Sequence, residues 1–295
     1  MMNTRGWAIW VLVALSSCTA NEEPAAVHGG LSPDAEAYLT DVHRVDDGGY
    51  YLAPRFSPDA RWLLLTGPKY RGLSVVDLES PGRVIPLCDE DYVGWPAVFE
   101  ADAVRTRTRD GREVLFRFRL PLDPRHGAAV ERIETGRLFD PKAATGPVHA
   151  YHEEDTIYLV RDGITTAISD RQDRYFAPRL SPDRSFLVYE GLRTGLYLYE
   201  VASRTTRAIG RGNHPAWLPD SSGLLYDVTE DDGADLTAGD LYLYSIRGAR
   251  SIRLTATADL IETHPVASAD GRLVAFESRG DIYVGRLVLR SDGRR

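Results

Sequence analysis

This chain of 295 residues is poor in cysteine, lysine and long apolar stretches. It has two cysteines, Cys18 and Cys88, too few for the disulfide framework on which small secreted domains depend. Stability must therefore come from buried apolar surface, for which the length suffices. Lysine occurs only at Lys69 and Lys142, and the formal net charge is −8. An acidic chain without basic runs argues against a nucleic-acid partner.

Sequence motifs that carry familiar chemistry are missing as well. We find no G-x-S-x-G segment for a nucleophilic serine, no phosphate-binding loop and no cysteine spacing typical of a metal site. Nor does any stretch show helical periodicity. The sequence favours an all-β protein that is not an enzyme, and it predicts no cofactor and no bound metal.

The longest apolar run stands near the start of the chain, from Trp7 to Leu15, after one positive charge at Arg5. Such a stretch is typical of a secretory signal and too short for a membrane-spanning helix. Its end, Leu15-Ser-Ser-Cys18, resembles a bacterial lipobox. The resemblance implies cleavage before Cys18 and attachment of lipid to its sulfur. An ordinary secretory signal with an incidental Cys18 is the alternative.

We therefore expect three segments. Residues 1–17 form a lipoprotein signal peptide, residues 18–34 a lipid-anchored flexible tether, and residues 35–295 the folded domain. The lipid would hold the protein on the periplasmic side of the cell envelope. Thr19 resembles the pattern for sorting to the outer membrane, which is the expected location.

One segment occurs four times without gaps. The copies read APRFSPDARWLLL, APRLSPDRSFLVY, HPAWLPDSSGLLY and HPVASADGRLVAF, and they begin at Ala53, Ala177, His214 and His264. Each copy has a proline at its second position and an aspartate five residues later. The Ser-Pro-Asp steps predict tight turns in which the aspartate satisfies backbone N–H groups. The apolar runs after the turns predict strands that are buried on both faces.

Further strand-like runs follow the copies, such as GLYLYEV from Gly195 and TTRAI from Thr205. Four short antiparallel strands per repeat describe one blade of a β-propeller. The copies mark four blades, and weaker segments that begin at Trp95 and Asp155 predict two more. We therefore predict a six-bladed β-propeller of four-stranded antiparallel blades, with roughly 40 residues per blade.

Ring closure is expected to involve the N-terminal part of the domain. The last blade lacks a fourth strand after Leu287, and residues 37–45 can supply it. Such a closing strand removes the open edge that a sheet protein otherwise has to protect. The Pro-x-Phe-Ser-Pro-Asp core also resembles the WD40-like PD40 repeat of TolB-like propellers. That resemblance covers residues 35–290 and implies the same six-bladed fold.

The residues before the repeat prolines are expected at the mouth of the central channel. Trp95, His214 and His264 are the least generic of them, because the other copies carry Ala53 and Ala177. An indole and two imidazoles around one opening suit a bound peptide or protein loop. These three residues are therefore the predicted binding site.

The sequence offers two alternatives that include a metal site. His214 and His264 can share an ion only with a third ligand, for which His149 or His152 are the obvious donors. The acidic segment 227–240, interpreted as a loop, offers carboxylates for calcium, although its spacing does not match a calcium-binding loop. Neither alternative displaces the prediction of no metal.

The expected function is that of a lipid-anchored scaffold or receptor for an envelope protein or peptide, with membrane contact through the lipid on Cys18. One alternative is a lyase or hydrolase with its active site at the channel mouth, and another is a small-ligand sensor. Three or more convergent histidine, glutamine or carboxylate side chains would favour an enzyme. An apolar or aromatic rim would favour a protein partner.

Overall fold

The computed structural model describes residues 31, 35–93, 97–100, 103–118, 130–138, 148–170 and 172–290. The signal peptide, Cys18, Trp95 and all of the tether except Leu31 lie outside these ranges. The described chain is built of β-strands and one short 3-10 helix, η1 (Pro68–Tyr70). Within these ranges there is no helix with the length and apolarity needed to cross a membrane.

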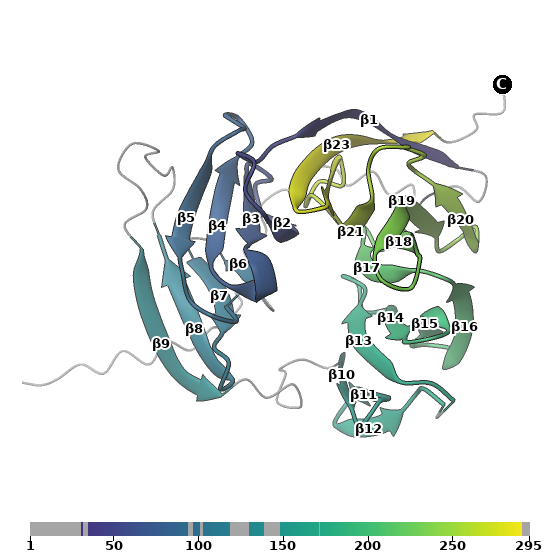
Figure 1. The fold of residues 1–295 in the computed structure, drawn as a ribbon. Helices are drawn as coiled ribbons and strands as arrows, with labels where there is room; N and C mark the ends of the chain where they lie inside the picture. Colours follow the sequence, from purple (N-terminus) through teal and green to yellow (C-terminus); the bar gives the residue numbers. More distant parts are fainter. Residues whose placement is uncertain are drawn as a thin grey trace, which may run out of the picture.

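The strands form six antiparallel sheets, here called blades 1 to 6, which follow one another around a ring (Figure 1). Blade 1 contains β2 (Leu52–Phe56), β3 (Trp62–Thr66), β4 (Leu73–Asp77) and β5 (Val84–Cys88). Blade 2 contains β6 (Val98–Glu100), β7 (Ala103–Arg107), β8 (Arg112–Arg117) and β9 (Glu131–Leu138). Blade 3 contains β10 (Val148–Glu153), β11 (Thr156–Arg161) and β12 (Ile164–Ala167).

Blade 4 contains β13 (Tyr175–Leu180), β14 (Phe186–Gly191), β15 (Gly195–Glu200) and β16 (Thr205–Gly210). Blade 5 contains β17 (Asn213–Trp217), β18 (Gly223–Asp231), β19 (Leu236–Ser245) and β20 (Arg250–Arg253). Blade 6 contains β21 (Glu262–Ala267), β22 (Leu273–Ser278), β23 (Asp281–Arg290) and β1 (Glu36–Arg44). The predicted six-bladed β-propeller is thereby confirmed, and blade 3 has three strands within the described residues.

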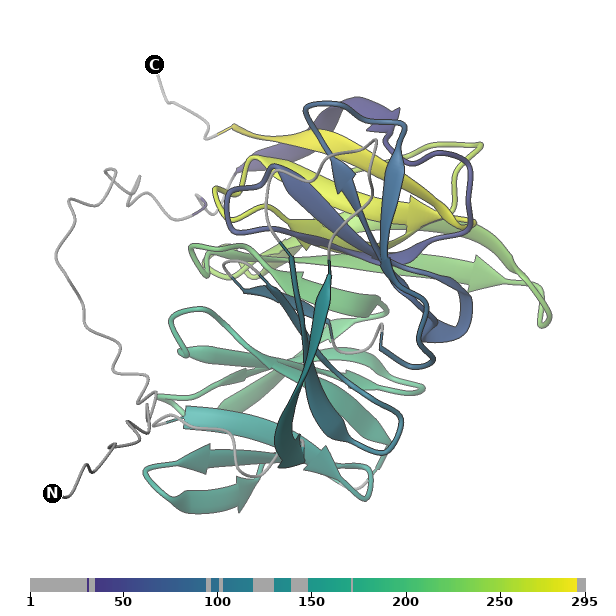
Figure 2. The same cartoon turned by 90° about the vertical axis from the view of Figure 1, so that its left-hand side faces the viewer.

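The predicted closing strand is also confirmed. In blade 6, β1 pairs antiparallel with β23, from Glu36 opposite Arg290 to Arg44 opposite Tyr283. Figures 1 and 2 show purple β1 beside yellow β23, although the two are far apart in sequence. The Ile282 N–H donates to Asp46 Oδ2 at 2.5 Å and extends the connection past the end of the ladder. The N-terminal part of the domain thus completes the last blade.

The repeat places its strands and turns as the sequence predicts. Every residue of β3 is buried, in keeping with a strand covered on both faces. In the turn of blade 1, Ser57 Oγ donates to Asp59 Oδ1 at 2.5 Å, and the Arg61 N–H donates to the same oxygen at 3.2 Å. Equivalent serine–aspartate hydrogen bonds recur at Asp183 and Asp270. These repeat aspartates are therefore structural turn residues.

The acidic segment of blade 5 differs from its prediction. We interpreted residues 227–240 as a loop, but the structure places most of them in the paired strands β18 and β19. Asp227 is completely buried, and Asp240 binds Arg253 at 2.7 Å between oxygen and nitrogen. Pairing with a partner strand satisfies the backbone of an acidic segment as well as that of an apolar one, so composition alone misled the prediction.

Candidate functional site

Four residues on the innermost strands share an unusual backbone conformation. Ala53, Ala177, His214 and His264, each directly before a repeat proline, have φ between 48° and 53°. This left-handed region is uncommon for residues other than glycine. At each of them the pairing with the second strand of the blade shifts in register, which defines a β-bulge. The bulge turns the backbone N–H out of its own sheet.

In three cases the turned N–H donates to a carboxylate on the second strand of the preceding blade. Ala53 N–H donates to Glu277 Oε2 at 2.9 Å, and His264 N–H donates to Asp227 Oδ1 at 3.0 Å. His214 N–H donates to Glu190 Oε2 at 3.3 Å. All three carboxylate residues are buried. Each one therefore joins two blades through a charge-assisted hydrogen bond.

Two of these carboxylates also hold a histidine ring of their own blade. His214 Nδ1 donates to Asp227 Oδ1 at 2.8 Å, and His264 Nδ1 lies 3.2 Å from Glu277 Oε1. The two imidazoles stack on each other, with ring centroids 3.4 Å apart and an interplanar angle of 24°. Their side chains are 37% and 23% exposed. The Nδ1 edge of each ring thus faces a buried carboxylate.

The charges of this cluster shift the ionisation of its members. Burial disfavours the imidazolium of His214, but the hydrogen bond and the charge of Asp227 outweigh burial and raise the pKa of His214. Burial likewise opposes the ionisation of Glu277, but the contact with His264 and the Ala53 N–H lower its pKa. Burial raises the pKa of Glu190. The surroundings thus favour the charged forms of His214 and Glu277 and disfavour that of Glu190.

Two arginines join the cluster from blades 1 and 4. Arg55 on β2 and Arg179 on β13 follow a repeat proline, and both are half-buried. Burial and the positive charge of Arg179 lower the pKa of Arg55 to about 10. Burial also lowers the pKa of Arg179, with a smaller opposing effect from Glu190. Blades 1 and 4, which carry β2 and β13, lie across the ring from each other (Figure 1).

We call this cluster the axial site. Its members are Arg55, Arg179, Glu190, His214, Asp227, His264 and Glu277. A cavity of about 490 Å³ adjoins it, because Glu277 lines the cavity together with Thr263, whose Oγ1 donates to Glu277 Oε1 at 3.1 Å. The cavity rim includes Tyr50 and Leu236, whose residues are 54% and 47% exposed. The axial site therefore combines convergent charged groups with a partly apolar rim.

The arrangement of the histidines does not match a metal centre. The possible third ligands His149 and His152 lie on β10 in blade 3, whereas the stacked pair lies on β17 and β21 in blades 5 and 6. Across the described residues no three histidine, cysteine or acidic side chains gather in a geometry that holds a metal ion.

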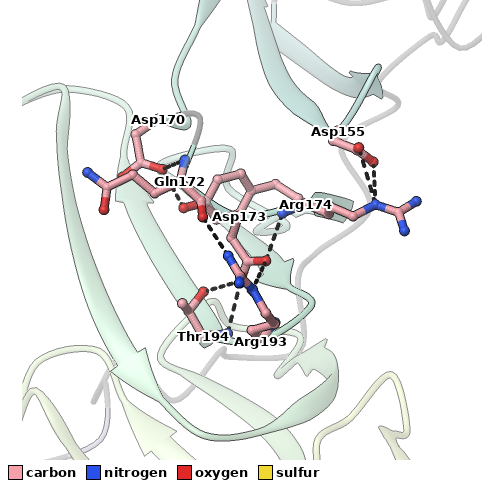
Figure 3. Close-up of polar contacts among 8 residues, drawn as sticks. Asp155, Asp170, Gln172, Asp173, Arg174, Arg193 and Thr194 are labelled. Atoms are coloured by element: carbon pink, nitrogen blue, oxygen red, sulfur yellow. Dashed lines mark hydrogen bonds and ion pairs between the residues drawn. The ribbon is translucent and has the colours of Figure 1, made fainter.

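A second polar cluster lies in a cavity of about 680 Å³ between blades 3 and 4 (Figure 3). At its centre, Asp173 accepts hydrogen bonds from Arg174 N–H, Arg193 N–H, Thr194 N–H and Thr194 Oγ1. The Asp173 side chain is only 1% exposed, and these donors hold its pKa below the usual range despite burial. Its oxygens are occupied by the adjoining turn, so this cluster fixes a loop.

The structure thus brings together two of the three residues predicted for binding. His214 and His264 stack, whereas Trp95 lies outside the described residues. Sequence reasoning missed the arginines and the carboxylates of the axial site. A signal for the carboxylates exists, because they stand 13 residues after the residue that precedes the proline in three of the four copies. These carboxylates are Glu190, Asp227 and Glu277.

The fold and the axial site define the protein as a β-propeller. No known protein family and no curated protein matches the chain. Among solved structures, an oligogalacturonate lyase from Vibrio parahaemolyticus is 13% identical, with 87% of this chain and 97% of that chain covered and a TM-score of 0.42. The Cps50 (Swd1) β-propeller domain of Myceliophteria thermophila is 11% identical, with 85% and 99% covered and a TM-score of 0.44.

A chain of a mitotic checkpoint complex is 14% identical, with 80% of this chain and 76% of that chain covered and a TM-score of 0.42. The three proteins have different functions. At this level of similarity they say nothing of what the present chain binds or whether it catalyses a reaction.

Proposed function

We propose that this protein is a non-enzymatic binding propeller, anchored by lipid on Cys18 to the periplasmic side of the cell envelope, where it serves as a scaffold or receptor. The bound partner is a segment of an envelope protein or peptide. It is expected to contact the three residues predicted for binding, Trp95, His214 and His264. The observation that carries the proposal is the stacked pair of half-exposed imidazoles on adjacent inner strands.

The rigidity of this pair supports recognition. Most strand residues of the propeller pack within and between blades, so we expect ligands to bind at the strand ends and along the ring axis. Each ring of the pair is fixed by a carboxylate on one edge and by the other ring on one face. A site held in place before binding loses little conformational entropy when a ligand arrives. The adjoining cavity with Tyr50 and Leu236 on its rim offers apolar contact area.

Site-specific photo-crosslinking in intact cells tests the proposal. A photoreactive residue at Leu236, on the cavity rim, should give a discrete adduct with one envelope component. The same residue at Ile164, an exposed position on β12, is the matched control and should give none. The Leu236 adduct should disappear in a Trp95→Ala/His214→Ala variant. Equal adducts at both positions, or an adduct that persists in the double variant, would refute the proposal.

One observation favours a second function, that of a lyase or hydrolase. The hydrogen bond between Asp227 and His214 Nδ1 orients an imidazole in the way that a general base requires. The adduct captured at Leu236 separates the two functions. Mass spectrometry should recover an intact partner if the protein only binds it. A cleaved or chemically altered partner whose alteration depends on His214 would instead establish catalysis.

A further inference from the structure

Two residues ahead of β1 are buried against the ring. Leu31 and Ala35 both belong to the apolar cluster between blades 5 and 6. Leu31 lies so close to Gly223 that a Cβ atom added to this glycine would stand 3.0 Å from Leu31 Cδ1. The Arg250 guanidinium donates a hydrogen bond to the Ala35 carbonyl oxygen. The chain is therefore attached to the ring before its first strand begins.

These contacts lie at one face of the ring, here called the turn face, which holds the turns 218–222 of blade 5 and 268–272 of blade 6. Gly223 follows the first of these turns, at the start of β18. Glu36, next to Ala35, begins β1 opposite Arg290, the last residue of β23. In Figure 2 this end of yellow β23 lies on the left. The N-terminal segment thus leaves the ring at the turn face.

The cavity that adjoins the axial site lies at the opposite face, here called the cavity face. Its lining includes Leu236, at the turn between β18 and β19, and Gly280, at the turn between β22 and β23. Both turns are at the strand ends remote from Gly223 and Arg290. β19 starts at Leu236 and has ten residues, which extend roughly 30 Å. The two faces are therefore about 30 Å apart.

The length of chain between the expected lipid and the ring limits how the ring can stand on a membrane. Leu31 follows Cys18 by 13 residues. A flexible chain of that length has a root-mean-square span of about 20 Å and reaches at most about 45 Å. The usual span is shorter than the distance between the two faces. A lipid on Cys18 therefore keeps the turn face closer to the membrane than the cavity face.

We propose that the anchored ring stands with its turn face toward the membrane and presents its cavity face to the aqueous phase. This inference rests on the proposed function and specifies the kind of partner. The partner is a polypeptide segment in the aqueous phase, because a segment embedded in the anchoring bilayer would meet the turn face. The tyrosine and leucine on the cavity rim, Tyr50 and Leu236, are then available to such a segment.

Energy transfer from the protein to lipids tests the orientation. The lipidated chain receives one fluorescent residue, either at Ala269 on the turn face or at Ala234 on the cavity face. Both are exposed alanines in turns between strands, so they form a matched pair. In vesicles that contain acceptor-labelled lipids, the fluorophore at Ala269 should lose a larger share of its emission than the one at Ala234. Insertion of about 60 flexible residues between Cys18 and Leu31 raises the span to roughly 45 Å and should abolish the difference.

The inference falls if the two positions transfer energy equally in the chain without the insertion, or if Ala234 transfers more. It also falls if the insertion leaves the difference intact, because the length of the attachment then does not set the orientation. The two proposals fail separately. A Leu236 adduct together with equal transfer refutes only this inference, and unequal transfer without an adduct refutes only the scaffold function. A chain without lipid on Cys18 would refute both.

Discussion

His214 combines an unusual backbone conformation with contacts of both its backbone and its side chain. Its backbone takes a left-handed conformation, its N–H reaches Glu190, and its ring binds Asp227 and stacks on His264. Alanine fills the same backbone position at Ala53, so the conformation does not require an imidazole. The repeat therefore does not need the imidazole for its backbone conformation, and that is why we assign the imidazole to recognition.

The raised pKa of His214 predicts how stability depends on pH. The imidazolium is favoured in the folded state, so its stabilisation is fully present below the ordinary pKa of 6.5 and is lost as pH rises through the higher folded value. Replacement by Gln removes this contribution. Urea unfolding should show a larger gap between the wild type and His214→Gln at pH 5.5 than at pH 8.5. A gap that is constant or grows with pH would contradict the assignment.

At the scale of elements, the junction between blades is the feature that repeats. A bulge on the first strand of one blade presents an N–H, and a buried carboxylate on the second strand of the preceding blade accepts it. Asp227 binds both the His264 N–H and the His214 ring, and it is completely buried.

Removal of Asp227 should therefore cost more stability than removal of an exposed acid from the same strand. We expect Asp227→Ala to lower the free energy of unfolding by about 3 kcal/mol, because a backbone N–H and an imidazole lose a buried acceptor. Glu230→Ala, an exposed position on β18, should change it by less than about 0.5 kcal/mol. Denaturant midpoints measure both, and equal effects would show that the junction is unimportant.

Closure by β1 is a second property of elements. Deletion of residues 36–44 leaves β23 with an open edge in place of a paired one. The variant should melt at a lower temperature than the full chain and form oligomers in size-exclusion chromatography. Val42→Ser, at an exposed position inside the β1 bulge, should behave like the wild type. A monomeric deletion variant with an unchanged melting temperature would refute the closing role.

Sequence reasoning worked where the repeat marks a local structure. The Ser-Pro-Asp turns, the buried second strands and the closing strand follow from proline geometry, apolar runs and a missing edge. Of the axial site, only the two histidines could be predicted from the sequence. His214 and His264 stand out from the alanine copies, but Asp227 and Glu277 look like polar ends of apolar strands. Their role depends on which blade lies next, and that information is spread over distant parts of the chain.

At the scale of the whole molecule, the propeller brings together residues that lie far apart in the sequence. Residues from blades 1, 4, 5 and 6 meet in the axial site, although Arg55 and His264 are separated by most of the domain. Four first strands supply one arginine or histidine each, three second strands supply the carboxylates, and the packing of the blades fixes their positions. The proposed anchor belongs to the same scale, because it decides where the ring is displayed.

The anchor gives a separate prediction. Because Leu15 to Cys18 resembles a lipobox, Cys18→Ser should leave the protein unlipidated and move it from the membrane fraction to the soluble fraction. Cys88→Ser is the control and should stay with the membrane. Mass spectrometry of the mature N-terminus checks the modification directly. An unmodified N-terminus at another residue would disprove the lipoprotein assignment.

The most direct test of the central claim, that ligands bind at the axial site, is side-chain nitrogen NMR of the histidines during a titration with the partner identified by crosslinking at Leu236. The chain has seven histidines, so each can be assigned by single replacement. We predict that the Nε2 resonances of His214 and His264 shift together, while those of His43 and His152 stay in place. Unmoved resonances for the stacked pair, or equal shifts at His43, would contradict the account.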